Sequence, residues 1–284
     1  MRGKTCLVTG ATDGIGWMTA RALARDGARV IVVGRNPEKG ERRVADLREE
    51  TGNGAVRFER ADLASQEEIR ALAMRLRANL PRLDVLVNNV GAWFHRRGAG
   101  PDNIEMTWAL NHLGQFLLTG LLLDLLGAAQ GARIVNVSSR AHQGPQVDFD
   151  DPEGARRYAG WRAYQQSKLA NVLFTYRLAE RLGAAGHVTA NCLHPGFVAS
   201  RFGHNNSGFA RIVAVASQRL FAISEEKGAV TSHYLAADES VGGTSGRYFV
   251  RCRPVESSAA SRDRDAQSRL WRLSEEMTGF RYPL

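Results

Sequence analysis

The sequence has few cysteines and no long apolar run, and both shortages exclude classes of protein. Its 284 residues include three cysteines, Cys6, Cys192 and Cys252, an odd number without metal-binding spacing. We therefore expect reduced thiols in or near the core and no metal site. No apolar run approaches the roughly 20 residues of a membrane span, and strand-like sequence from Lys4 leaves no room for a signal peptide. These features predict a cytoplasmic protein without a membrane span.

Composition and charge are typical of a folded globular protein. The net charge is +9 and 44% of the residues are hydrophobic. The arginines are spread along the chain and form no basic stripe interleaved with aromatic residues, so we expect no nucleic-acid partner. The charge is interpreted as a solvated surface that can attract anionic ligands. The length suits one domain covering residues 1–284, without internal repeats.

A glycine-rich turn follows the first β-prone run, residues 4–9. Gly10, Gly14 and Gly16 stand between this run and a helical pattern that continues to Ala24. Strand, glycine turn and helix in this order are the context of a dinucleotide-binding fingerprint. Gly10 permits the tight turn, Gly14 lets the backbone approach a pyrophosphate, and Gly16 lets the helix pack on the strand. The phosphates would bind to free N–H groups at the helix N-terminus.

Arg35 follows the second expected strand, residues 28–33. An acidic side chain at this place would hold the adenosine ribose of NAD, whereas a planar guanidinium suits a 2′-phosphate. The sequence therefore favours NADP(H), and the alternative is that Arg35 is one more surface arginine. Asn36 and Pro37 predict the N-cap and first residue of the next helix.

Two further strands, residues 55–59 and 83–87, deliver polar residues to the same sheet edge. Asp62 follows the first of them and could accept a hydrogen bond from an adenine amino group or simply shape the turn. Asn89 and Gly91 follow the second, where an amide and a glycine can close the sheet edge and leave room for a cofactor ribose.

The pattern from about residue 102 to 126 predicts one long helix with Asn111 in its middle. A buried amide must find partners or cost roughly 1 to 3 kcal/mol. Asn111 therefore either makes structural hydrogen bonds or holds an ordered water, and its spacing does not separate these roles. Ser65 and Glu68 predict a capping box at the start of an earlier helix.

Later strands are expected at residues 133–137, 189–193 and 247–250. The first ends in Ser138-Ser139 and the second in a His-Pro-Gly sequence at 194–196. Open α/β sheets bind ligands at the carboxyl ends of their strands. Strands that alternate with helices throughout predict an α/β fold with a doubly wound parallel sheet, the Rossmann fold, in a single domain.

A tyrosine and a lysine stand four residues apart in the helical pattern of residues 156–182. Residues four apart lie on one side of a helix, so the Tyr164 phenol and the Lys168 ammonium can address a common point. A phenol has an ordinary pKa of about 10, and a fixed positive charge beside it favours the phenolate. The pair is a candidate acid–base catalyst; such spacing is also common on helix surfaces.

Together these motifs resemble the short-chain dehydrogenase/reductase family over nearly the full chain. The residues that carry the resemblance are Thr9–Gly16, Asn88–Gly91, Asn111, Ser139, Tyr164-x-x-x-Lys168 and Pro195-Gly196. Val90 departs from the family pattern, which has alanine there. Ile134–Ser139, the wide gap between Ser139 and Tyr164, and Ser167–Phe174 resemble most closely the retinol dehydrogenase branch.

The resemblance implies four catalytic residues. Tyr164 would donate or accept the proton, Ser139 would orient the carbonyl, Lys168 would bind the ribose and lower the tyrosine pKa, and Asn111 would hold a water. It favours Ser139 over Ser138. The implied cofactor site consists of Gly10, Thr12, Asp13, Gly14, Ile15, Gly16, Arg35, Asp62, Leu63, Asn89, Gly91, Tyr164, Lys168, Pro195, Gly196 and Val198.

The expected function is NADP(H)-dependent interconversion of an alcohol and a carbonyl compound, an aldehyde or a ketone. Apolar residues among glycines and asparagines predict a lid over the substrate at about 197–225, although ordinary core helix fits them as well. With Trp93, Phe94 and Trp161 they indicate a lipophilic substrate. The tail at about 254–284 contains an amphipathic segment, residues 270–277, expected to pack on the body. The alternative function is a non-catalytic dinucleotide-binding regulatory protein, and the apolar helices could pair in a homo-oligomer.

Overall fold

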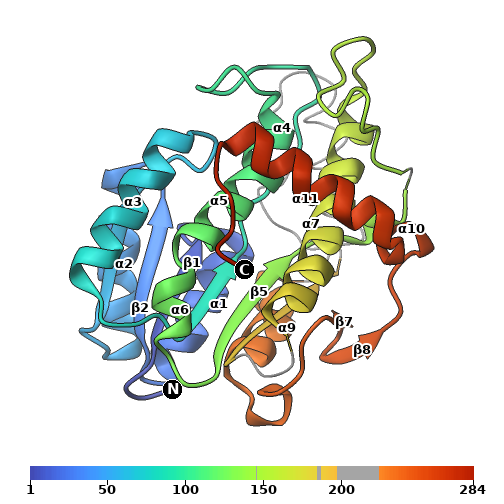
Figure 1. Ribbon diagram of the computed structural model, residues 1–284. Helices are drawn as coiled ribbons and strands as arrows, with labels where there is room; N and C mark the ends of the chain where they lie inside the picture. Colours follow the sequence, from blue (N-terminus) through green and yellow to red (C-terminus); the bar gives the residue numbers. More distant parts are fainter. Residues whose placement is uncertain (145, 184–186, 197–223) are drawn as a thin grey trace.

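The computed structural model describes residues 1–144, 146–183, 187–196 and 224–284 (Figure 1). One eight-stranded sheet has the order β3-β2-β1-β4-β5-β6-β7-β8, with β1 to β7 parallel and β8 antiparallel to β7. The strands are β1 (Thr5–Thr9), β2 (Arg29–Gly34), β3 (Val56–Arg60), β4 (Val85–Asn88), β5 (Ala132–Val137), β6 (Val188–Leu193), β7 (Tyr248–Val250) and β8 (Arg253–Val255). The predicted doubly wound sheet is confirmed, and β8 is an edge strand that the sequence analysis did not predict.

Helices cover both faces of this sheet. The helices and helical turns are α1 (Gly14–Arg25), α2 (Pro37–Thr51), α3 (Gln66–Asn79), α4 (Met106–Trp108), the π-helical turn η1 (Ala109–Leu113), α5 (Gly114–Leu121), α6 (Leu123–Gly127), the 3₁₀ turn η2 (Arg140–Gln143), α7 (Gly160–Leu182), α9 (Glu225–Ala237), the 3₁₀ turn η3 (Glu239–Val241), α10 (Ala259–Arg262) and α11 (Arg264–Thr278). None of the described helices is both long and apolar enough to cross a membrane.

The sheet divides the hydrophobic core into two layers. On one face, Leu7 and Ile31 belong to a cluster with residues of α3, α5, α7 and α11. On the other face, Val8 and Val30 belong to a cluster with residues of α1, α2 and α9. Neighbouring residues of a strand point to opposite faces, so the apolar runs in the sequence reflect strands that are buried on both sides.

The strand order reverses beside β1. β2 and β3 lie on one side of this strand, and β4 and the later strands lie on the other. Doubly wound sheets bind their ligands in the crevice at such a reversal, outside the carboxyl ends of the strands. The glycine turn, the ends of β4 and β5, and the start of α1 therefore meet at the place where a ligand site is expected.

The prediction of one continuous helix over residues 102–126 is wrong. α4 begins at Met106, a π-helical turn follows at Ala109–Leu113, and α5 ends at Leu121 before the short α6. A π-turn interrupts the regular α-helical pattern and is common at functional sites. Here the turn contains Asn111, whose side chain bonds to a neighbouring loop. The apolar spacing predicted helix, but it could not reveal this change of pitch.

The N-caps of two helices were predicted, with one exception in detail, whereas the helix expected from about residue 156 begins at Gly160. The Asn36 side chain accepts a hydrogen bond from Lys39 N–H, as a cap does. Ser65 likewise accepts from the N–H of Glu68. The Glu68 carboxylate accepts instead from Asp62 N–H and pairs with Arg60. The start of α3 is therefore capped by its serine, but the reciprocal half of the predicted capping box is wrong.

The C-terminal segment packs on the body, as predicted. The amphipathic helix extends beyond the predicted 270–277, and α11 lies across α5 and α7 (Figure 1). Trp271 packs against Phe116 of α5 and Phe174 of α7, with ring centroids 5.4 and 6.0 Å away. Tyr282 adds a ring 4.6 Å from Trp271. This aromatic cluster fixes the tail to the two helices that lead to the site.

Candidate active site

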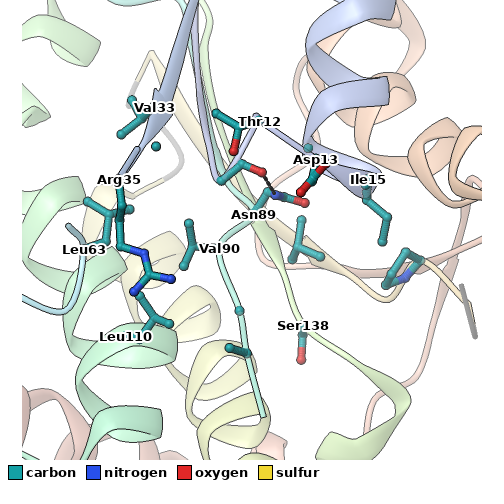
Figure 2. Close-up of a pocket in the computed structure, with 18 of the residues that line it drawn as sticks. Thr12, Asp13, Ile15, Val33, Arg35, Leu63, Asn89, Val90, Leu110 and Ser138 are labelled. Atoms are coloured by element: carbon teal, nitrogen blue, oxygen red, sulfur yellow. Dashed lines mark hydrogen bonds between the residues drawn. The ribbon is translucent and has the colours of Figure 1, made fainter. Parts of the chain in front are cut away.

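A cavity of about 360 Å³ lies above the glycine turn (Figure 2). The predicted site residues that line it are Gly10, Thr12, Asp13, Gly14, Ile15, Gly16, Arg35, Leu63, Asn89, Gly91, Tyr164, Lys168 and Pro195. Of the described candidates for the cofactor site, Asp62 and Gly196 are not among the lining residues, and Val198 lies outside the described part of the chain. The catalytic candidates Ser139 and Asn111 are not among the lining residues either. Residues that the sequence analysis had not assigned also line the cavity: Val33, Gly34, Ala61, Val90, Ala92, Leu110, Val137 and Ser138. Most of these stand at strand ends, which is the signal that could have identified them.

The glycine turn has the shape that a phosphate site needs. Gly10 and Gly14 have φ angles of 61° and 57°, in the left-handed region that favours glycine. A Cβ on Gly16 would lie 2.5 Å from the Gly10 carbonyl oxygen, so only glycine lets α1 begin this close to β1. Among the described residues, the Asp13 side chain makes no capping bond to α1. The first N–H groups of the helix are therefore not capped by it and fit a bound phosphate.

Arg35 stands at the end of β2 and reaches toward the cavity (Figure 2). Its side chain is 65% exposed, and one guanidinium nitrogen lies 3.9 Å from Asp62 Oδ2. The other Asp62 carboxylate oxygen accepts from Ala64 N–H at 3.0 Å. This bond shapes the turn, and the adenine contact of Asp62 stays a prediction. Lys39 pairs with Asp13, which is one of the residues that line the cavity.

Tyr164 lines the cavity and is buried, with 7% of the residue exposed. Burial raises the pKa of its phenol to about 12, and a hydrogen bond with the Ser139 side chain opposes this rise. The structure therefore joins the predicted hydroxyl and phenol. The predicted lowering of the Tyr164 pKa by Lys168 is not found: the groups of the described chain hold this phenol in its protonated form.

Lys168 lies four residues after Tyr164 on α7. Its Nζ atom is 5.9 Å from the centre of the Tyr164 ring and donates to the Val137 carbonyl at 3.0 Å. Burial lowers the pKa of the ammonium to about 8. A Cβ on Gly91 would lie 2.7 Å from Nζ, so this glycine makes room for the ammonium. Lys168 stays mainly charged at neutral pH, close to the cavity.

The two serines after β5 have different partners. The Ser138 hydroxyl donates to the Lys168 carbonyl at 2.7 Å and is buried. The Ser139 hydroxyl accepts from Ala141 N–H at 3.2 Å, and it is the side chain that opposes the rise of the Tyr164 pKa. Ser138 thus fastens β5 to α7, while Ser139 is the serine that meets the phenol.

Asn111 makes structural hydrogen bonds at the π-turn. Its amide oxygen accepts from Ala92 N–H at 2.8 Å, and its amide nitrogen donates to the Ala92 carbonyl and to Ser167 Oγ. Ser167 Oγ in turn donates to the Tyr164 carbonyl. This chain of bonds ties the loop after β4 to the helix that carries Tyr164. The water-holding role of Asn111 stays a prediction.

His142 is a supporting residue that the sequence analysis missed. Its Nδ1 lies 2.8 Å from the Ser139 carbonyl oxygen and its Nε2 accepts from Ser258 N–H. These partners require the proton on Nδ1. Burial lowers the pKa of His142, so the neutral ring connects the Ser139 turn with the C-terminal segment. One contact lies within an irregular turn and the other joins segments far apart in the sequence, so the periodicity of the sequence could not predict them.

The fold and the site together define an α/β oxidoreductase of the nucleotide-binding type. A sequence profile of the short chain dehydrogenase family matches residues 4–211. The chain belongs to the short-chain dehydrogenase/reductase family.

Its relatives confirm the resemblance to retinol dehydrogenases. Retinol dehydrogenase 12 of Mus musculus is 40% identical over 280 residues, covering 99% of this chain and 88% of that protein. Dehydrogenase/reductase SDR family member 13 of Homo sapiens is 42% identical over 284 residues, covering 98% and 74%.

Solved structures agree with the fold. A crystal structure of a protein from Mycobacterium paratuberculosis superposes with a TM-score of 0.80 at 32% identity, covering all of this chain and 96% of that one. A short chain dehydrogenase from Escherichia coli CFT073, complexed with NADPH, gives 0.71 at 26% identity, covering 89% and 98%.

Proposed function

We propose that this protein is an NADP(H)-dependent oxidoreductase that interconverts a lipophilic alcohol with its aldehyde or ketone. One observation supports the proposal most strongly. The Tyr164 phenol, the Ser139 hydroxyl and the Lys168 ammonium lie close together, beside the cavity above the glycine turn. A protein that only sensed a dinucleotide would have no use for this combination.

The residues of the chain suggest how a carbonyl is reduced. A bound nicotinamide cofactor supplies the hydride. The Ser139 hydroxyl orients the carbonyl oxygen, and Tyr164 donates its phenolic proton as negative charge develops there. A pKa of about 12 keeps this proton in place at neutral pH. Lys168, whose Nζ lies 5.9 Å from the centre of the Tyr164 ring, would bind the ribose of the cofactor beside the reacting carbonyl.

The choice of NADP(H) over NAD(H) rests on the cations at the adenosine end. Arg35 lines the cavity, and Lys39 pairs with Asp13, which also lines it. Both can attract a 2′-phosphate, and Arg35 can bind it with two N–H groups. Family members complexed with NADPH or NADP support this choice. The cytoplasmic location, the lid at about 197–225, which lies almost wholly outside the described residues, and a homo-oligomer remain predictions.

Replacing the phenol tests the proposal. Tyr164→Phe should bind NADPH as the wild type does, because the ring remains, but lower kcat for aldehyde reduction roughly 100-fold or more because the proton donor is lost. NADPH oxidation with a panel of hydrophobic aldehydes measures turnover, and calorimetry measures cofactor binding.

Tyr234→Phe is the matched control, since it removes a phenol that lies on α9 and is absent from the cavity lining. Substantial turnover by Tyr164→Phe would refute the assignment. Tight NADPH binding by a wild type that reduces no aldehyde and oxidises no alcohol would favour the regulatory alternative.

A further inference from the structure

The Trp161 indole is stacked against the ring of Tyr164. The two ring centroids are 5.4 Å apart and the planes are 28° from parallel, which is a stacked arrangement. Half of Trp161 is nevertheless exposed, and among the exposed large apolar residues of the described chain it is the aromatic one. The indole therefore packs against the proposed proton donor on one side and is exposed on another. The exposed side could contact a substrate bound at Tyr164.

A second tryptophan holds this indole in place. Trp93 meets Trp161 edge to face, with centroids 6.1 Å apart and planes at 89°. Trp93 follows Ala92, whose backbone N–H and carbonyl are both bonded by Asn111. Offset and edge-to-face pairs at 4.5–7 Å are the favoured aromatic geometries. The position of the indole therefore depends on the same π-turn that supports Tyr164.

The start of α7 is fitted closely to the loop after β4. A Cβ on Gly160 would overlap the Phe94 carbonyl oxygen and lie 2.8 Å from the Cα of His95. Only a glycine permits this approach, and it precedes Trp161 directly. The close contact fixes the start of α7, and with it the backbone that carries the indole.

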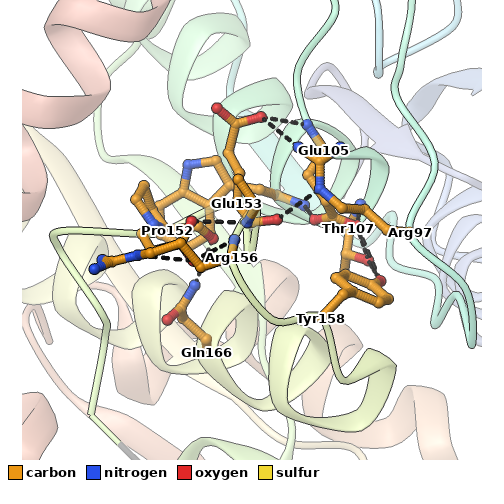
Figure 3. A network of polar contacts seen from close by, with 11 residues as sticks. Arg97, Glu105, Thr107, Pro152, Glu153, Arg156, Tyr158 and Gln166 are labelled. Atoms are coloured by element: carbon orange, nitrogen blue, oxygen red, sulfur yellow. Dashed lines mark hydrogen bonds and ion pairs between the residues drawn. The ribbon is translucent and has the colours of Figure 1, made fainter.

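Polar contacts fasten the segment before α7, which contains Glu153 and Tyr158, to the same loop (Figure 3). The Tyr158 hydroxyl lies 3.0 Å from Glu105 Oε1 and 3.1 Å from the Phe94 carbonyl oxygen. The buried Glu105 side chain also accepts from the N–H groups of Thr107 and Trp108. Glu153 accepts from the N–H of Glu105. Both segments that carry the tryptophans are therefore fixed before any substrate binds.

We propose that Trp161 is a specificity-determining residue that selects carbonyl compounds with a flat, π-bonded group attached to the carbonyl carbon. This inference rests on the proposed function. A carbonyl oxygen bonded to the Tyr164 and Ser139 hydroxyls places its carbon substituent near the edge of the Tyr164 ring. Trp161 is not itself one of the residues that line the cavity, but it stacks on the ring of Tyr164, and its exposed part forms an apolar wall beside that ring. A flat aryl group can stack on this wall, whereas a saturated ring of the same carbon skeleton cannot.

The test compares benzaldehyde with cyclohexanecarbaldehyde, which share a carbon skeleton but differ in flatness. The wild type should prefer benzaldehyde in kcat/KM. Trp161→Leu keeps an apolar side chain but loses the π face, and should reduce this preference about 2- to 10-fold. Trp161→Phe should keep the preference within about twofold. Met74→Ala, which removes a 65% exposed apolar side chain on α3, is the control for surface apolarity.

A binding measurement separates recognition from turnover. Calorimetry with the unreactive benzamide and cyclohexanecarboxamide should show the same change of preference in Trp161→Leu, with an unaltered melting temperature. If Trp161→Leu keeps the wild-type preference in both measurements, Trp161 does not determine specificity although the proposed function stands. If the wild type turns over neither aldehyde nor any hydrophobic carbonyl of the panel, the proposed function fails and this inference fails with it.

Discussion

His112 should make the stability of the protein fall in mild acid. The residue belongs to the π-turn beside Asn111, is fully buried, and packs its ring 4.9 Å from that of Trp108. Its Nε2 lies 2.7 Å from Ser274 Oγ, and that hydroxyl donates to the Leu270 carbonyl, so Nε2 must be the donor. Within the described chain, Nδ1 has no hydrogen-bond partner. Protonating Nδ1 would therefore place an unpaired charge in the core.

The expected loss can be worked out from the pKa values. Burial lowers the pKa of His112 from 6.5 to about 3, so the unfolded chain binds the proton first as the pH falls. The stabilisation from the neutral ring is complete above pH 6.5 and is lost progressively toward pH 3. Between pH 7 and pH 4.5 this one residue should cost about 2.5 kcal/mol of unfolding free energy.

Urea unfolding of the wild type and of His112→Gln at the two pH values measures this contribution. Glutamine can still donate to Ser274 but does not titrate, so the variant should lose about 2.5 kcal/mol less than the wild type on acidification. Its stability at pH 7 is expected to be lower, because packing with the Trp108 ring is lost. The test therefore compares the pH dependence of the unfolding free energy and not its value at one pH. His187→Gln, at an exposed position, is the control. Equal pH dependence in wild type and His112→Gln would refute the reasoning.

Two further predictions concern the proposed site. Arg35→Asp should weaken NADPH binding about 10- to 100-fold while sparing NADH, because a carboxylate replaces the cation proposed to bind the 2′-phosphate; an unchanged ratio of the two dissociation constants would remove Arg35 from the site. Ser139→Ala should lower kcat roughly 100-fold with little change in melting temperature. Ser138→Ala should instead cost about 1 kcal/mol of stability through its lost bond to the Lys168 carbonyl. The opposite pattern in the two serine variants would mean that the first serine faces the substrate.

Local sequence signals predicted the parallel core well. Each of the seven parallel strands was expected within one or two residues of its observed bounds, because strands buried on both faces leave continuous apolar runs between glycine or polar ends. The antiparallel β8 was missed because it has only three residues, all exposed, with Pro254 in the middle. Such a strand has neither periodicity nor an apolar run, and its existence depends on pairing with β7.

The site residues that belong to sequence motifs were predicted, and the residues that depend on tertiary contacts were missed. The glycine turn, Arg35 and the Tyr164 helix were expected at the sheet edge, and they line one cavity. The rise of the Tyr164 pKa could not be predicted, because it follows from burial that no local spacing encodes. The contact of His142 with the C-terminal segment was invisible for a similar reason: its partners, Ser139 and Ser258, are 119 residues apart (258 − 139).

The C-terminal helix also limits how two copies of this protein can associate. The sequence alone allowed the apolar helices to pair between subunits. Trp271 and Tyr282 now occupy the outer surface formed by Phe116 of α5 and Phe174 of α7. The C-terminal segment of the same chain thus covers this surface. A dimer would have to form elsewhere or first displace α11, at the cost of uncovering the aromatic cluster that steadies the helices behind the site.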